Sequence, residues 1–307
     1  MEYFLELFFG GLTRGSIYAL IALGYTMVYG ILQLINFAHG DVLMVGAMVA
    51  VSVAPALLAM GLPGPLVLVL CVLTAIPVCV ALSLAIERIA YRPLRNAPRL
   101  APLITAIGVS IVIQTVAMMI WKPRPRAFPD LLPTDPYEFG GALLAPKQIL
   151  ILVVAALVMT GLLLLVNPTR LGRAMRATAE NPQIASLMGV NANQVIAATF
   201  AIGAALAAVA GVLYGMNYNK AEFMMGVIPG LKAFTAAVLG GIGNLGVAVL
   251  GGLLLGVIES LGAGYICDLT GDFLGSQYQD IFAFVVLIIV LVFRPSGLLG
   301  ERVADRA

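Results

Sequence analysis

Long apolar runs separated by short polar segments constrain the fold of this chain more than any other feature. A helix that crosses a bilayer needs about 20 mostly apolar residues. Hydrophobic residues make up 61% of the chain and charged residues only 10%, against about 25% charged residues in soluble domains. The sequence therefore predicts an all-α polytopic membrane protein, a single domain over 1–307 that forms a bundle of about eight to ten membrane segments. The expected spans are roughly 16–36, 42–60, 65–86, 101–121, 148–166, 194–217, 224–241, 246–267 and 280–293.

Two of these runs depart from an ordinary span. Pro229, Gly230 and Lys232 interrupt the run 224–241, and the last run is short. The stretch KAFTAAVLGGIGN at 232–244 carries glycines that suit a broken helix or a tight turn. Broken or re-entrant segments are therefore expected within the bundle.

Several classes of function are excluded by composition and motif. A net charge of +2 without a basic, aromatic-rich stripe argues against nucleic-acid binding. The single His39 and the three cysteines show no metal-ligand spacing. No GxxxxGK[ST] loop occurs, so the chain is not expected to bind ATP. No catalytic constellation is present, and we expect neither an enzyme nor a cofactor bound by this chain. The acidic start, MEYFLELFFGG, lacks the basic leader of a cleaved signal peptide.

Basic residues in short loops predict the orientation in the membrane. The loops 87–99 and 167–193 are arginine-rich and lie two spans apart, so both are expected to face the cytoplasm. The segment 268–280 is acidic and is expected outside, which returns the tail after Phe293 to the inside. Counting spans places the loop 122–147 outside.

The side of the N-terminus stays open at this stage. Three crossings before the loop 87–99 would place it outside, whereas Arg14 near the first span favours the inside. Either residues 3–12 lie in the membrane interface or an early segment is re-entrant.

The stretch Leu171–Val195 reads as a capped helix between two spans. Asn181 is a favourable N-cap, Pro182 suits the first helical position, and Gly189 permits the left-handed turn that ends a helix. On an arginine-rich side of the membrane, such a helix is suited to docking a cytoplasmic partner. An ordinary capped loop is the alternative.

Polar residues within the apolar runs are candidates for function, because an ionisable group at membrane depth is costly without water or a partner. They comprise the segment 36–41, the stretch 232–244, Glu259 and Gln114. For Glu259 the alternatives are pairing with a lysine or the backbone, or lining a substrate path. For His39 and Asp41 in the first segment, the alternative is a capped loop at the end of a span.

Small residues recur four apart in three places. The pairs are Gly11 with Gly15, Gly211 with Gly215, and Gly252 with Gly256. Close packing joins helices in lipid, and small residues permit it. Together these pairs predict a tightly packed bundle.

Four long motifs carry a family resemblance. They are TRGSIYALIALGYTMVYGILQLINFAHGD (13–41), GRAMRATAENPQIASLMGVN (172–191), KAFTAAVLGGIGN (232–244) with GGLLLGVIES (251–260), and FRPSGLLGE (293–301). They resemble, in order and over nearly the whole chain, the LivH-type permeases, which are membrane subunits of branched-chain amino acid ABC importers.

The resemblance implies an assembly in the inner membrane. A second, LivM-like permease would complete the channel, two ATPase subunits would bind beneath and use ATP, and a periplasmic binding protein would deliver the substrate. The cargo would be leucine, isoleucine or valine, with other amino acids, amides or urea as the alternative within the family.

The resemblance also implies roles for individual residues. The helix after Asn181 and Pro182, ending at Gly189, would be the coupling helix that enters the ATPase groove. Arg173, Arg176 and Glu180 would flank that contact, together with Asn181.

The mechanism expected is alternating access driven by the ATPase subunits. Asn36, Thr235, Asn244 and Glu259 are the candidates for the translocation path. A passive channel is one rival interpretation, favoured by the glycine content, but it leaves the arginine-rich capped loop unexplained. An ion-coupled secondary transporter is the other. It requires buried carboxylates as coupling sites, of which only Glu259 clearly qualifies.

Overall fold

The computed structural model describes residues 2–269 and 279–294, apart from Asn96, Arg99, Gly140 and Ile242. Most of the acidic segment expected outside, most of the motif at 293–301 and the C-terminal tail lie outside the described residues. Within them, the all-α polytopic fold is confirmed. Seven helices are long and apolar enough to cross a membrane, and two apolar helices are shorter.

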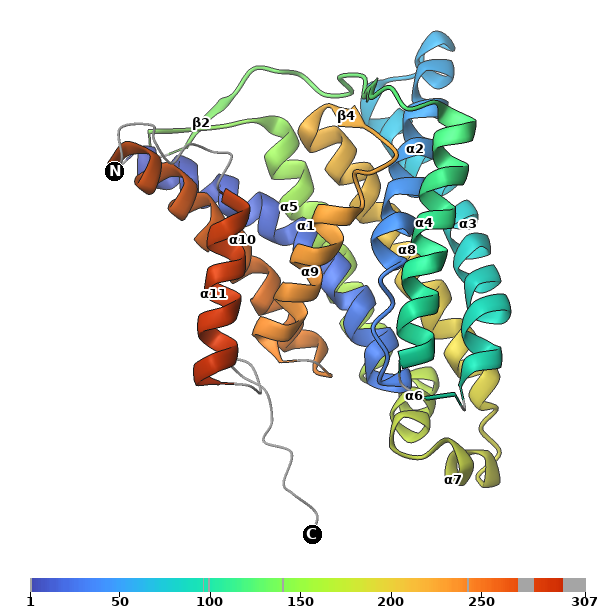
Figure 1. The fold of residues 1–307 in the computed structure, drawn as a ribbon. Coiled ribbons are helices and arrows are strands. Elements are labelled where there is room, and N and C mark those ends of the chain that lie inside the picture. The colour runs from blue at the N-terminus through green and yellow to red at the C-terminus, as the bar shows by residue number, and fades with distance from the viewer. Residues whose placement is uncertain are drawn as a thin grey trace.

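The helices run in chain order through one bundle, with short strands in its connections (Figure 1). The seven long helices are α1 (Glu2–Leu32), α2 (His39–Ala59), α3 (Gly64–Ile86), α4 (Leu100–Trp121), α5 (Pro146–Val166), α8 (Ala192–Tyr218) and α10 (Leu245–Leu269). The shorter helices are α6 (Arg170–Glu180), α7 (Pro182–Leu187), α9 (Val227–Gly240) and α11 (Gln279–Phe293). A π-helical turn, Glu87–Tyr91, and a 3-10 turn, Arg92–Leu94, extend α3. Strand β1 (Arg126–Ala127) pairs with β4 (Lys220–Ala221), and β2 (Tyr137–Phe139) with β3 (Ala142–Leu144), both antiparallel.

The first helix corrects the expected first span. It begins at Glu2 rather than near residue 16 and is 31 residues long, about 46 Å at 1.5 Å per residue. Arg14 is a residue of this helix, and its guanidinium lies 3.9 Å from the Glu259 carboxylate. Because Arg14 is not a loop residue, it carries no information on sidedness.

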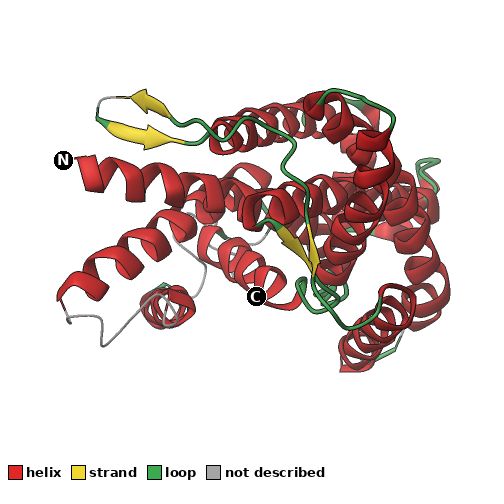
Figure 2. Ribbon diagram, turned by 90° about the horizontal axis from the view of Figure 1, so that it is seen from above, coloured by secondary structure: helices red, strands yellow, loops and turns green. Residues whose placement is uncertain are grey.

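The same helix settles which end of the bundle holds the N-terminus. Its first turns lie beside the β2–β3 hairpin (Figure 2), where the Leu143 amide donates to Glu6 Oε1 at 3.4 Å. This hairpin belongs to the connection between α4 and α5, at the end of the bundle opposite α6 and α7 (Figure 1). Residues 3–12 are continuous with the rest of α1, so they do not form a separate interfacial segment.

Glycines bring α1 and α10 into backbone contact, the most extensive packing in the bundle. A Cβ at Gly256 would lie 2.3 Å from Gly15 Cα, and one at Gly11 would lie 2.8 Å from Val257 Cα. Two of the predicted small-residue pairs therefore face each other. The third lies on α8, where a Cβ at Gly211 would meet Leu43 of α2. The tightly packed bundle is confirmed.

Two segments interrupt regular helix inside the bundle. Between α1 and α2 the chain is irregular from Gln33, which has a φ of +53°, until α2 begins at His39. Helix α9 has 14 residues, or about 21 Å, too short for the hydrocarbon core of about 30 Å. Its first residues meet the start of α2, since a Cβ at Gly226 would lie 2.1 Å from the Gly40 oxygen.

The glycine-rich stretch after α9 forms the expected tight turn. The helix ends at Gly240, and Gly241 has a φ of +122°, which a residue with a side chain rarely adopts. The Asn244 carboxamide then accepts from the Gly246 and Val247 amides and caps α10. The predicted break at 232–244 is confirmed.

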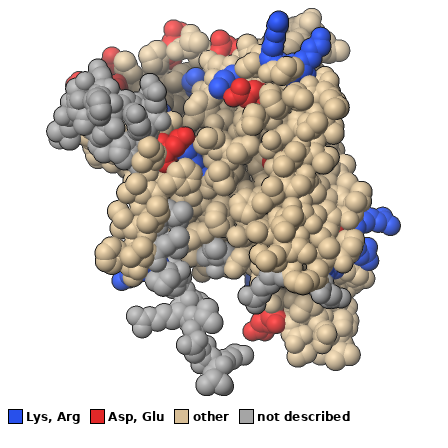
Figure 3. Space-filling model, in the orientation of Figure 1, with Lys and Arg blue, Asp and Glu red and all other residues tan. Residues whose placement is uncertain are grey.

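Charge is distributed as a membrane-embedded surface requires. In Figure 3, Lys, Arg, Asp and Glu gather toward the two ends of the molecule, and a broad band of other residues lies between them. Helix α4 carries many exposed apolar side chains, among them Ile104, Ile111 and Met119. In water such a surface would aggregate, whereas lipid covers it.

Substitution of Gly256 by valine should disrupt the α1–α10 contact. We expect a loss of about 1–3 kcal/mol, because the added atoms meet the backbone of Gly15. Thermal unfolding in detergent measures the change as a lowered Tm. Gly161→Val on α5 is the matched control, since a Cβ there meets no atom within 4 Å. Equal losses in the two variants would contradict the packing argument.

Candidate functional site

A buried ion pair lies where α1, α9 and α10 meet. Lys232 Nζ of α9 lies 2.9 Å from Glu259 Oε1 of α10, and the two side chains are 3% and 0% exposed. The Tyr18 hydroxyl of α1 lies 3.4 Å from both groups. Of the two alternatives for Glu259, pairing with a lysine is therefore the one observed. Its second oxygen, Oε2, is buried without a hydrogen-bond partner among the described residues.

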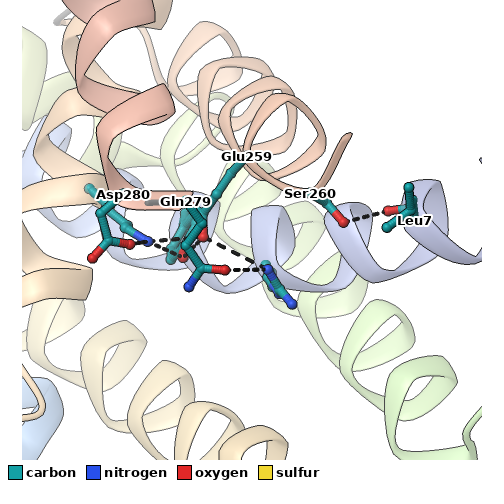
Figure 4. Close-up of polar contacts among 8 residues, drawn as sticks. Leu7, Glu259, Ser260, Gln279 and Asp280 are labelled. Carbon is teal, nitrogen blue, oxygen red and sulfur yellow. Dashed lines mark hydrogen bonds and ion pairs between the residues drawn. The ribbon is translucent and has the colours of Figure 1, made fainter. Parts of the chain in front are cut away.

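Two further charges complete the cluster from α1 and α11. Asp280 Oδ1 lies 2.5 Å from Lys232 Nζ, and the Arg14 guanidinium lies 3.9 Å from Glu259 and donates to Gln279 Oε1 at 3.2 Å. Figure 4 shows Gln279 and Asp280 extending from α11 toward Glu259. The cations Arg14 and Lys232 balance the carboxylates of Glu259 and Asp280. Charges inside a membrane protein are costly unless they are paired in this way.

A pocket of about 240 Å³ adjoins this cluster. Its polar wall consists of three tyrosines and three residues of the cluster: Tyr18, Tyr214, Tyr218, Lys232, Gln279 and Asp280. The tyrosines on α8 stand one helical turn apart, with ring centroids 4.5 Å from each other. The sequence did not indicate Tyr214 or Tyr218, and it used Asp280 only as an acidic residue of the segment 268–280 expected outside. Lys232 and Glu259, ionisable groups inside apolar runs, were its signal for a site here.

A second polar cluster lies at the start of α2. Gln114 Nε2 of α4 donates to Asp41 Oδ1 at 2.9 Å and also contacts Ser110 Oγ at 3.1 Å. Asp41 is 2% exposed and lines a pocket of about 160 Å³ between α2, α4 and α9. His39 is also buried and packs edge-on against Tyr25 at 4.9 Å. These residues lie inside the bundle rather than in a capped loop.

The other candidates for the translocation path have local partners. Asn36 Oδ1 accepts from the Tyr91 hydroxyl at 2.9 Å, and the Thr235 hydroxyl donates to the Leu231 oxygen of its own helix. Asn244 is the exposed cap of α10. No hydrogen bond or ion pair between described residues joins these three to one another or to Glu259. Their role in a path stays a prediction.

A different candidate site projects from one end of the bundle. Helix α6 packs under the end of α5, where Arg176 donates to the Val166 and Asn167 oxygens and Arg173 donates to the Pro168 oxygen. Arginines suit this position because the last carbonyls of a helix lack partners. Arg173 and Arg176 therefore fix α6 to α5, a role that the sequence did not indicate. Glu180 ends α6 and is exposed.

The capping predicted for α7 is confirmed. Asn181 Oδ1 accepts from the Gln183 and Ile184 amides at 2.9 and 3.0 Å, and Pro182 takes the first helical position. Gly189 adopts the left-handed φ of +84°, and the Val190 amide returns to the Ala185 oxygen at 3.0 Å. The helix is therefore defined by its own sequence.

The tip of α7 is apolar and exposed. Ile184, Leu187 and Met188 are 60%, 85% and 81% exposed, whereas Ala185 is buried against the rest of the segment. Figure 1 shows α7 as the outermost element at this end. Exposed apolar side chains on a projecting polar segment indicate a contact surface for another protein. The sequence showed the caps, but not which side chains they expose.

These features define an all-helical polytopic membrane protein with a charged cluster inside the bundle and a helical projection at one end. The profile of the family described as "branched-chain amino acid transport system / permease component" matches residues 7–291. The chain belongs to this family.

Individual relatives match along almost their full length. The chain is 50% identical to the high-affinity branched-chain amino acid transport system permease protein BraD of Pseudomonas aeruginosa, over 99% of this chain and 98% of BraD. It is 45% identical to LivH of Escherichia coli K12 over the same shares. A probable LivH of Methanocaldococcus jannaschii is 26% identical over 95% of this chain and 91% of that protein. No solved structure matches the chain.

A double-mutant cycle should measure the buried ion pair. Glu259→Gln and Lys232→Met each leave the cluster with a net charge, which should cost about 3–5 kcal/mol of stability. The double variant restores balance and should cost less than the two singles together, as a Tm series in detergent would show.

The exposed pair Lys220–Glu222, with Nζ and Oε1 3.2 Å apart, is the control. Its cycle should show a coupling of at most about 1 kcal/mol. Additive losses at the buried pair would contradict the balanced cluster.

Proposed function

We propose that this chain is a permease subunit of an ATP-driven ABC importer that carries branched-chain amino acids across the inner membrane. The observation that carries the proposal is the similarity to BraD and LivH along almost the whole of all three chains. The pocket beside the charged cluster and the apolar tip of α7 are the features that a substrate path and a partner contact require.

The proposed assembly places α6 and α7 in the cytoplasm. The arginines of α6 and of the loop 87–99 favour that side. Helix α11 runs back toward the end that holds α6 and α7 (Figure 1), so the C-terminus would also be cytoplasmic. A second, LivM-like permease would complete the path, and a periplasmic protein would deliver the substrate at the opposite end.

Two ATPase subunits would bind ATP and contact α7. Alternating access requires that their movement reach the spans. The bonds of Arg173 and Arg176 tie α6 to the end of α5, and the Asn191 carboxamide caps α8 directly after α7. Arg95 adds a link from the end of α3 to Asn193. A displacement of α7 would therefore move α5 and α8 together.

Replacing Leu187 and Met188 by aspartate should release the ATPase subunits. Loss of a hot spot costs about 2 kcal/mol or more, which is roughly a 30-fold weaker affinity. Both side chains are more than four-fifths exposed, so the permease itself should keep its Tm. Co-purification of the ATPase subunits measures the loss.

Gln183→Asp together with Ser186→Asp is the matched control, because it adds the same two negative charges to exposed polar positions of the same helix. We expect it to retain the ATPase subunits. Retention by the Leu187 and Met188 variant as well would refute the assignment of α7 as the coupling helix.

Reconstitution distinguishes the importer from a secondary transporter. The complete complex in proteoliposomes should take up leucine only with ATP and the binding protein. The permease chain alone should transport nothing, even under a proton or sodium gradient. Gradient-driven uptake of leucine by this chain alone would instead support ion coupling through the buried carboxylates.

A further inference from the structure

We propose that the pocket beside Lys232 and Asp280 is a binding site for a zwitterionic amino acid with an apolar side chain. The inference rests on the proposed import of branched-chain amino acids and assigns the place where this chain holds the cargo in transit. The argument combines three properties of the pocket: its charge balance, its free polar groups and its apolar wall.

Charge balance selects a zwitterion. Arg14, Lys232, Glu259 and Asp280 together carry no net charge, and the pocket's other ionisable pair, Lys220 with Glu222, is also balanced. A ligand with one ammonium and one carboxylate group preserves this balance. A purely cationic or anionic ligand would leave an unpaired charge in a site of low dielectric, which is costly.

The ammonium group of the ligand has an acceptor in Asp280. The Asp280 side chain is 33% exposed and lines the pocket, whereas Lys232 and Glu259 are almost fully buried. A carboxylate offers about four lone-pair sites, and Lys232 contacts one oxygen of Asp280. An incoming ammonium group can therefore bind Asp280, while Lys232 stays paired with Glu259.

The carboxylate group of the ligand has donors on the same wall. Tyr214 and Tyr218, whose hydroxyl groups are neutral donors, line the pocket together with Gln279. The Gln279 oxygen accepts from Arg14, so its NH2 group is the part that can donate to a ligand. Neutral donors suit this role because they bind a carboxylate without adding net charge.

The apolar wall accommodates an aliphatic side chain. Met224 and Met225, just before α9, and Ile228 in its first turn also line the pocket. Methionine adapts to ligands of different shape, as a site for several related side chains requires. The volume of about 240 Å³ is smaller than the about 300–1,000 Å³ typical of sites for drug-sized ligands. A small amino acid matches it.

The position of the pocket suits delivery from outside. Lys220 of β4 and Glu222 lie at its edge, and β4 pairs with β1 of the connection between α4 and α5. This connection lies at the end of the molecule opposite α6 and α7 (Figure 1). A substrate released by a periplasmic protein would therefore meet the pocket before it reaches the cytoplasmic half.

Cysteine protection tests the site in the assembled importer. Ile228→Cys, in a background with Cys267→Ser, places a thiol in the pocket, and the buried Cys71 and Cys79 should not react with a water-soluble methanethiosulfonate. We expect leucine to slow modification of this thiol several-fold. Isocaproate, which lacks the ammonium group, and isoamylamine, which lacks the carboxylate, should not.

Val227→Cys is the matched control, since its neighbouring position on α9 lines the other pocket with Asp41. Leucine should not protect it. No protection at position 228, equal protection at both positions, or equal protection by all three ligands would each overturn the proposal. Asp280→Asn in the Ile228→Cys variant should abolish protection while the complex still assembles. Persistent protection there would also overturn the role of Asp280.

This outcome is separable from the proposed function. Leucine uptake by the unmodified complex tests import alone. Uptake without protection at position 228 would reject this site and leave the importer assignment intact.

Discussion

The charged cluster at the meeting point of four helices is the constraint on which the rest of the bundle depends. Glu259 cannot lie in lipid without a partner, and its partners come from α1 and α9, with α11 adding Asp280. Removing Lys232 or Glu259 would leave the other charge buried and uncompensated, whereas Arg14 and Asp280 are each about one third exposed. The cluster therefore specifies how α1, α9, α10 and α11 meet, beyond any apolar contact between them.

Glycines allow α1 and α10 to approach closely enough for this cluster to form. The backbone contact of Gly15 with Gly256 brings α1 against α10 less than one turn from both Arg14 and Glu259. About two turns before Arg14 in α1, the Leu7 oxygen accepts from the Ser260 hydroxyl of α10 at 2.7 Å, as Figure 4 shows. Close helix packing and charge pairing therefore depend on each other.

The irregular segments place polar groups at depth. Backbone outside a helix is tolerated within a membrane protein only where protein or a cavity surrounds it. The short α9 has one polar pocket on each side, one with Lys232 and one with Asp41. Helix α9 begins beside Gly40 and holds Lys232 against Glu259, inside the bundle and away from lipid.

The sequence by itself determined what depends on local chemistry. Long apolar runs predicted the spans, glycines predicted close packing and the break after Gly240, and the caps of α7 at Asn181, Pro182 and Gly189 followed from residue type alone. Only the tertiary structure decided which groups meet. The sequence does not show that Arg14 lies 3.9 Å from Glu259, 245 positions away, or that Arg176 donates to the Val166 oxygen at the end of α5. The contact of Arg173 and Arg176 with a partner stays a prediction. The reason is physical: capping and hydropathy act within one or two turns, whereas the energy of a buried charge depends on what packing brings to it from elsewhere in the chain.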